Sequence, residues 1–350
     1  MNISFSTILL QWFCENGREL PWRETRDPYA VWLSEIILQQ TRIEQGRDYW
    51  LRFMRRWPTV ESLAAATEDE VLREWQGLGY YSRARNLLVA ARQIVALGRF
   101  PNTFDALRKL KGVGDYTAAA IASIAFDEPV AVVDGNVYRV LSRYFGIDTP
   151  INTTEGKKTF TALAQSLLPP KEASAYNQAM MDFGAIQCTP RSPRCVLCPL
   201  QETCDALHTG RTATLPVKLR TLKIRERHLT YIYIRCNGQT AIHRRGVGDI
   251  WQGLWEPYME APSQPPPEGE EASPTARLQP RPLRGEAGRG LLLRKGVRHQ
   301  LTHQTLIADF YLLETDERPP LPDEYVWIDE QEFDRYAKPR LVEQLLQLLP

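Results

Sequence analysis

The feature that most constrains the fold of this chain is a group of four cysteines near its middle, spaced C-x6-C-x2-C-x5-C: Cys188, Cys195, Cys198 and Cys204. Pro193 and Pro199 flank the central pair, so this stretch cannot continue as a regular helix or strand. Four thiolates in a short loop are the ligand set of tetrahedral zinc or of an iron–sulfur cluster. The spacing alone does not choose between these two, whereas a disulfide framework is a distant third because nothing in the chain is typical of a secreted protein.

Length and composition indicate a globular protein of two domains. The chain has 350 residues, of which 43% are hydrophobic and 24% charged. Its net charge of +1 means that any contact with nucleic acid must come from local basic patches. We expect a cytoplasmic location, because the start of the chain lacks the features of a signal peptide and no apolar run approaches the roughly 20 residues of a membrane span. Cys14 and Cys236 stand apart from the cluster and are expected to be small buried hydrophobes.

The pattern of the chain changes near residue 205. In residues 1–205, apolar positions recur at three- and four-residue steps, which predicts successive helices, among them 31–41, 49–57, 68–75 and 84–97. A basic connector follows at 206–228. Residues 229–350 contain strand-like patterns at 229–235 and 305–313 and end in an apolar helix at 340–349, which indicates a smaller α+β domain. The stretch 261–290 is rich in Pro, Gly and Glu and is predicted to be a disordered loop.

The segment 110–120, LKGVGDYTAAA, contains two glycines just before a predicted helix. Gly112 and Gly114 permit a tight turn and a close approach of backbone N–H groups to a ligand. Successive N–H groups at the start of a helix bind anions, and DNA phosphate is the natural candidate. Taken alone, the same letters also fit an ordinary turn between two helices.

Two carboxylates are candidates for chemistry. Asp134 precedes an amphipathic helix, where it can serve as the N-cap or face a cleft and stabilise a developing cation. Glu35 lies within the apolar stretch VWLSEIIL, so burial is expected to raise its pKa and let it hold a proton to donate. The alternative for Glu35 is a place on the one wet face of its helix.

The order of motifs resembles that of one enzyme family. These motifs are LPW at 20–22, WLSEIILQQT at 32–41, GLGYYSRARN at 77–86, LKGVGDYTAAA, VVDGNVYRV at 132–140 and the four-cysteine loop. Together they are similar to the helix-hairpin-helix DNA glycosylases and, among these, to the MutY-type adenine DNA glycosylases. The resemblance implies a mainly α N-terminal domain with a 4Fe-4S cluster in the loop 188–204, followed by a Nudix-like α+β C-terminal domain.

The resemblance also implies roles for individual residues. Glu35 matches the acid that protonates adenine as it leaves, and Asp134 matches the carboxylate that stabilises the cationic sugar. Asn136 matches a residue that hydrogen-bonds near this aspartate. Tyr116 stands where related endonuclease III-type enzymes have a lysine; because tyrosine cannot form an imine with the sugar, we expect an abasic product with the strand intact.

Further residues are expected to contact the DNA. Gln40 and Tyr80 match the residues that wedge into the duplex as the adenine is extruded. Arg23 and Asp182 match positions that contact the flipped adenine.

The C-terminal domain is expected to recognise the base opposite the target. The segment 249–256, DIWQGLWE, resembles a part shared with Nudix folds, but the hydrolytic Nudix motif is absent. The family detects 8-oxoguanine through a loop that usually reads Phe-Ser-His, and the matching residues are Leu301, Thr302 and His303. Leu301 lacks the aromatic surface on which a base could stack, which is worth roughly 1–3 kcal/mol.

The expected function is therefore base excision repair at the bacterial nucleoid. We expect a monomeric, monofunctional DNA glycosylase that hydrolyses the N-glycosidic bond of adenine mispaired with 8-oxoguanine or guanine in duplex DNA. Two alternatives stay open: a relative that excises thymine or uracil, and an iron–sulfur protein that binds DNA without catalysis. Glu35, Asp134 and Tyr116 together favour the enzyme, because a protein that only binds DNA needs none of them.

Overall fold

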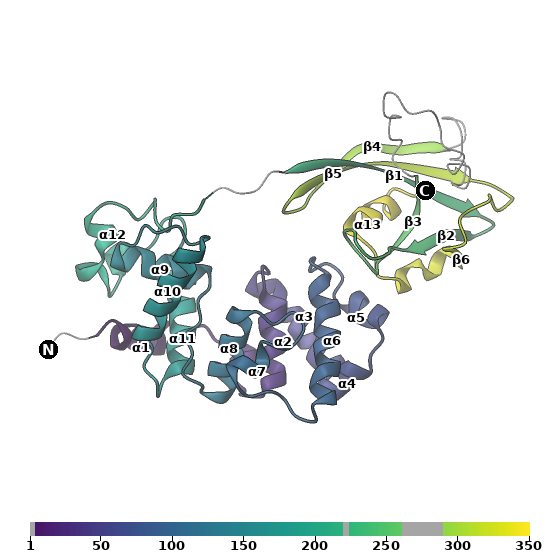
Figure 1. Ribbon diagram of the computed structural model, residues 1–350. Coiled ribbons are helices and arrows are strands. Elements are labelled where there is room, and N and C mark those ends of the chain that lie inside the picture. Colours follow the sequence, from purple (N-terminus) through teal and green to yellow (C-terminus); the bar gives the residue numbers. More distant parts are fainter. Residues whose placement is uncertain (1–3, 220–223, 261–289) are drawn as a thin grey trace, which may run out of the picture. The chain divides into compact units, whose positions relative to one another are not determined.

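The computed structural model describes residues 4–219, 224–260 and 290–350 (Figure 1). Contacts divide the chain into two compact units. Unit 1 comprises Met1–Ala66 and Asn86–Arg220, and unit 2 comprises Thr67–Arg85 and Thr221–Pro350. The loop predicted to be disordered at 261–290 lies outside the described residues, apart from its last residue.

Helices form unit 1, as the 3.6-residue periodicity predicts. They are α1 Phe5–Asn16, α2 Pro28–Leu38, α3 Ile43–Arg56, α4 Val60–Ala65, α7 Phe104–Leu107, α8 Asp115–Phe126, α9 Gly135–Phe145, α10 Thr154–Leu167, α11 Ala173–Asp182 and α12 Asp205–His208, together with the π-helix Phe183–Gln187 and the 3-10 turns Pro21–Arg23, Cys195–Leu197 and Gln201–Thr203. Helix α6, Ser82–Ala96, begins in unit 2 and ends in unit 1. The four helices predicted above are confirmed as α2, α3, α5 (Glu68–Glu74) and α6.

Helix α2 lies at the centre of unit 1. Asp27 caps its N-terminus by accepting hydrogen bonds from the N–H groups of Tyr29 and Ala30, and Pro28 occupies the first helical position. Every residue from Tyr29 to Ile37 is buried. The helix packs on α3 and α8. It ends earlier than the predicted residue 41, because the chain turns at Gln40, where φ is +55°.

The glycine turn before α8 has the predicted form. Gly112 has a φ of +78°, and a Cβ there would lie 2.7 Å from the Cβ of Asn86, so both the backbone and the neighbouring side chain require glycine. Gly114 is the N-cap of α8 and has an extended backbone, which does not demand glycine. Both glycines are exposed, so the turn is open to a ligand.

A six-stranded mixed sheet dominates unit 2. Its order is β4-β5-β1-β3-β2-β6, with β1 and β5 parallel and the other pairs antiparallel. The strands are β1 Arg225–Cys236, β2 Gln239–Arg244, β3 Trp255–Glu260, β4 Leu291–Gln300, β5 Gln304–Glu314 and β6 Tyr325–Asp329. The helices are α5 Glu68–Glu74 and α13 Arg340–Leu346, with a 3-10 segment at Glu330–Arg335. Both predicted strands and the final helix are confirmed, and β1 takes its first residues from the end of the predicted connector.

The core of unit 2 lies between the sheet and α13. Tyr231 and Phe310, from the parallel pair β1 and β5, are fully buried together with Leu341 and Leu345 of α13. Truncating a fully buried leucine of this kind to alanine typically costs about 2–5 kcal/mol.

Residues 67–85 join unit 2 through polar contacts. Glu68 of α5 pairs with Arg244 at 3.0 Å, and Gln76 donates a hydrogen bond of 2.5 Å to Glu343 of α13. The division by contacts therefore differs from the single boundary predicted near residue 205.

Cys236 is buried as expected, whereas Cys14 is exposed. Helix α1 buries Phe5, Leu9 and Trp12, which share one helical face, and Cys14 falls on the other side. None of the described helices combines the length and the apolar character needed to cross a membrane.

Candidate active site

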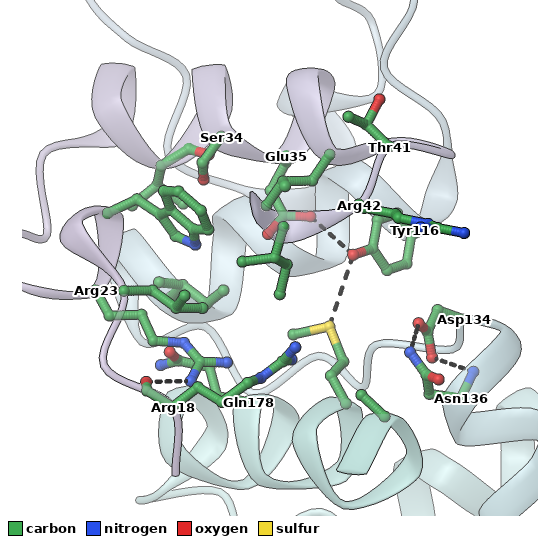
Figure 2. A pocket seen from close by; sticks show the side chains of 18 residues that line it. Arg18, Arg23, Ser34, Glu35, Thr41, Arg42, Tyr116, Asp134, Asn136 and Gln178 are labelled. Carbon is green, nitrogen blue, oxygen red and sulfur yellow. Dashed lines mark hydrogen bonds between the residues drawn. The ribbon is translucent and has the colours of Figure 1, made fainter. Parts of the chain in front are cut away.

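A cavity of about 300 Å³ in unit 1 is lined by all four of the predicted catalytic residues (Figure 2). Glu35 comes from α2, Tyr116 from α8, and Asp134 with Asn136 from the start of α9. Arg23 also borders the cavity. Residues that are separated by about 100 positions in the sequence are thus placed around one space.

Glu35 is an unusually buried acid. Its exposed fraction is 7%, which excludes the wet-face alternative. The Tyr116 hydroxyl donates a hydrogen bond of 2.8 Å to its Oε2. The pKa of Glu35 is raised to about 7, chiefly by burial; the bond from Tyr116 and the charge of Arg23 oppose the rise, while the charge of Asp134 adds to it. A large fraction of Glu35 therefore holds a proton near neutral pH.

Asp134 is both the N-cap of α9 and a wall of the cavity. Its Oδ1 accepts hydrogen bonds of 2.8 Å from the N–H groups of Asn136 and Val137. Burial raises the pKa of Asp134, but these bonds and the nearby Arg139 limit the rise. The two predicted roles, cap and cleft carboxylate, are compatible in this geometry.

Asn136 fixes the second oxygen of that carboxylate. Its Nδ2 donates to Oδ2 of Asp134 at 2.8 Å, and its Oδ1 accepts from Arg139 at 2.7 Å. Gly184 leaves room for this contact, because a Cβ there would lie 2.5 Å from the Cβ of Asn136. The carboxylate of Asp134 is thus held in one orientation.

Tyr116 contacts Glu35 and also lies 3.6 Å from the Sδ of Met181 (Figure 2). Burial and the two carboxylates raise the pKa of Tyr116 well above its ordinary value, so it stays a protonated donor. No lysine is among the described residues that line the cavity. Lys109 and Lys111 are exposed on the glycine turn instead.

Arg23 and Asp182 are neighbours, but only Arg23 borders the cavity. Asp182 is completely buried and accepts two hydrogen bonds of 2.8 Å from Arg23. It also accepts bonds from the backbone N–H and the guanidinium of Arg18. Burial alone would raise the pKa of Asp182, but the two arginines hold it below its usual range. Its direct contact with adenine stays a prediction, and in this geometry the carboxylate positions the two arginines.

Arg18 was missed by the sequence analysis, although it borders the cavity. The signal that could have found it is Asp182 itself. An aspartate in the apolar stretch AMMDFG needs a cationic partner when buried, and an arginine before the LPW motif can supply one.

The residues predicted to wedge into DNA share a backbone property. Gln40 has a φ of +55° and Tyr80 a φ of +47°, a left-handed conformation that is uncommon for residues other than glycine. Both side chains are exposed. Such strain is frequent at sites that meet a ligand.

A second cavity, of about 580 Å³, lies within unit 2. Tyr80, Leu301, Thr302 and His303 all border it. The Tyr80 hydroxyl and the Thr302 hydroxyl share a hydrogen bond. The loop predicted to read the opposite base therefore lines a cavity with hydroxyl and imidazole groups.

The four cysteines of the loop ring one small cavity: Cys188, Cys195, Cys198 and Cys204. Arg143 donates to the Cys188 sulfur at 3.4 Å. Burial, with the other thiols nearby, raises the pKa of Cys198 to about 11, so four thiolates can coexist only around a cation. Within the described residues, no three potential ligands converge on a point that suits a single metal ion. Four thiols placed around one shared space suit a cluster that is held by cysteine thiolates.

Family models cover both units of the chain. Residues 33–170 match the HhH-GPD superfamily of base excision DNA repair proteins, 188–204 match the iron-sulfur binding domain of endonuclease III, and 230–348 match the NUDIX domain. The chain is therefore a helix-hairpin-helix protein of base excision repair with a Nudix-like domain. The loop residues hold a 4Fe-4S cluster, which settles the choice that the spacing left open.

Curated relatives narrow the class to a family. The adenine DNA glycosylase of Buchnera aphidicola from Schizaphis graminum is 35% identical over 254 residues, covering 72% of this chain and 73% of that protein. The rat adenine DNA glycosylase is 44% identical over 227 residues. That match covers 61% of this chain and 44% of the rat protein, so the chain spans less than half of that relative's length. The chain belongs to the adenine DNA glycosylase family.

Among solved structures, a thermostable thymine-DNA glycosylase is similar with a TM-score of 0.55 and 32% identity. The match covers 59% of this chain and 95% of that one. The chain is thus also similar to a glycosylase that is named for thymine rather than adenine.

Proposed function

We propose that the chain is a monofunctional adenine DNA glycosylase. It hydrolyses the N-glycosidic bond of adenine mispaired with 8-oxoguanine or guanine in duplex DNA, and it acts as a monomer in the cytoplasm. The observation that carries the proposal is the meeting of Glu35, Tyr116 and Asp134 at one cavity. Membership of the adenine DNA glycosylase family supports adenine as the substrate.

In the proposed reaction, Glu35 gives its proton to a ring nitrogen of adenine. The bond between the sugar and the base then breaks, and its electron pair leaves with the neutral base. Asp134 stabilises the positive charge that develops on the sugar, as a carboxylate does in other glycoside cleavages. Water adds to the sugar carbon, and the proton that it loses restores the acid. The products are free adenine and an abasic site.

The remaining residues of the cavity orient these groups. Asn136 and the N-terminus of α9 hold Asp134 in place, so little reorganisation is needed as charge develops. Arg18 and Arg23, fixed by Asp182, supply hydrogen-bond donors at the cavity wall for the extruded base. Because no lysine borders the cavity among the described residues, the sugar meets no amine and the strand stays intact.

Recognition of the opposite base is assigned to unit 2. Thr302 and His303 border its cavity and can hydrogen-bond to a purine. These groups are the proposed readers of 8-oxoguanine.

Excision of thymine is the second candidate, because a thymine-DNA glycosylase shares the fold at 32% identity. The Nudix-like match at 230–348 favours adenine paired with a damaged purine, because this domain supplies the cavity proposed to read the opposite base.

The test is single-turnover base release from labelled duplexes that hold adenine opposite 8-oxoguanine, adenine opposite guanine, or thymine opposite guanine. Each reaction is analysed with and without alkali, beside a Glu35→Gln variant. Adenine release with strand cuts only after alkali, lost in the variant, supports the proposal. Thymine release would favour the second candidate, cuts without alkali would indicate a lyase, and no release at all would leave a DNA-binding protein.

A further inference from the structure

Trp251 is the largest aromatic side chain at the cavity of unit 2. It borders the same space as Leu301, Thr302 and His303. Its ring centroid lies 5.8 Å from that of His299, with an angle of 52° between the two planes. The aromatic surface absent from position 301 is thus present on a different loop.

The backbone at Trp251 is held in an uncommon conformation. Its φ is +60°, which a bulky residue rarely adopts unless the surroundings fix it. Two hydrogen bonds fix this turn: the Leu254 N–H donates to the Trp251 carbonyl at 3.0 Å, and the Gly253 N–H donates to the Arg245 carbonyl at 2.9 Å. Trp251 is also partly buried and packs against the core of unit 2, which holds the indole at the edge of the cavity.

Arg245 lies over the indole, with its Cζ 5.9 Å from the ring centroid. This arginine is 6% exposed and cannot move freely. It donates to both oxygens of the fully buried Glu256 at 2.6 and 2.7 Å, and to Asp249 at 2.6 Å. Asp249 in turn pairs with Arg227 through bonds of 2.6 and 2.7 Å. The indole therefore has a rigid charged support.

We propose that Trp251 is the stacking surface for the purine that lies opposite the excised adenine. The inference rests on the proposed function and deepens it, since it names the residue that binds this base. Stacking tolerates any base because every base has a π-face. Trp251 thus supplies affinity for a purine of either kind, while Thr302 and His303 supply the distinction between 8-oxoguanine and guanine.

The test measures binding rather than base release. The full chain with Glu35→Gln binds duplexes in which the residue opposite adenine is 8-oxoguanine, guanine or an abasic site. Adding Trp251→Leu is expected to weaken binding to both purine duplexes by roughly 5- to 150-fold, towards the affinity for the abasic duplex. Affinity for the abasic duplex and the ratio between 8-oxoguanine and guanine should stay unchanged, and Trp251→Phe should retain most of the affinity.

Trp327→Leu is the matched control. Trp327 lies on β6 with Arg318 over its ring at 5.0 Å, but it does not border the cavity, so binding should be unaffected. Trp251→Gly is a second variant if leucine prevents folding, because glycine suits a φ of +60°. Equal loss on all three duplexes, or no loss on any, would overturn the assignment of Trp251. Because binding needs no base release, failure of the proposed activity would show separately in the assay of adenine release.

Discussion

The hydroxyl of Tyr116 donates a hydrogen bond of 2.8 Å to Oε2 of Glu35, across 81 residues of sequence. The bond does two things. It gives the buried carboxylate a partner, which lowers the cost of ionising it, and it fixes the direction in which the other oxygen faces the cavity (Figure 2). An acid that gives up a proton and takes it back in each turnover needs both forms to be accessible near neutral pH.

Replacing Glu35 with glutamine should abolish base release without abolishing DNA binding. Glutamine keeps the shape but has no proton to give, and removal of a positioned general acid typically costs about 10²–10⁴-fold. Single-turnover rates and duplex affinity, measured on the same preparation, check this. Loss of affinity together with activity would instead assign Glu35 a structural role.

The rate of base release should fall as pH rises above about 7, because Glu35 must be protonated to act and its pKa lies near that value. Tyr116→Phe removes a hydrogen bond that favours the carboxylate, so the fall should move to higher pH. Tyr138→Phe is the control, since Tyr138 lies on α9 but does not border the cavity. A profile that stays in place in Tyr116→Phe would contradict the link between the two side chains.

The free energy of unfolding should also depend on the protonation of Glu35, and it should fall as pH rises. The pKa of Glu35 is raised on folding from 4.5 to about 7, so its protonated form favours the folded state. That contribution is complete below pH 4.5 and is lost as pH rises to 7, a change of about 3 kcal/mol. Urea unfolding at several pH values should therefore show that the stability of Glu35→Gln rises relative to that of the parent chain between pH 5 and 8. A constant difference between the two chains would argue against a buried, titrating Glu35.

Asp182→Asn should be strongly destabilising. It leaves Arg18 and Arg23 without the buried carboxylate that both contact, and breaking a buried pair from one side typically costs about 3–5 kcal/mol. Asp127→Asn is the matched control, because the Arg26–Asp127 pair is exposed and such pairs are worth about 0–1 kcal/mol. Equal effects of the two substitutions on the free energy of unfolding would refute the stabilising role of the buried contacts between Asp182 and the two arginines.

Features written in local sequence could be predicted. The apolar run around Glu35 indicates a buried helix, and the alternation in β1 and β5 indicates strands. The motif order also indicates which residues meet at the cavity of unit 1, although their catalytic roles stay predictions.

Features set by distant contacts could not be predicted. Arg18 and Asp182 are 164 residues apart: the apolar stretch around Asp182 indicates that this aspartate needs a cation, but no local pattern shows which arginine supplies it. Residues 67–85 join unit 2 through side-chain contacts such as that of Gln76 with Glu343, and such contacts produce no periodic pattern in the sequence. The left-handed backbone at Gln40, Tyr80 and Trp251 could not be predicted either, because the identity of a residue other than glycine does not indicate a positive φ.

Cys198→Ser should lose the cluster and with it the order of the loop 188–204. Burial, and next the nearby thiols, raise the pKa of Cys198, so the thiolate form needs the positive charge that the metal supplies. Iron and acid-labile sulfide, measured per chain, should fall from four each to near zero, and the melting temperature should fall with them. Cys14→Ser, at an exposed thiol on α1, should keep the full content. Zinc in place of iron in the parent chain would overturn the assignment of the cluster, whereas full iron content in Cys198→Ser would show that another residue replaces this ligand.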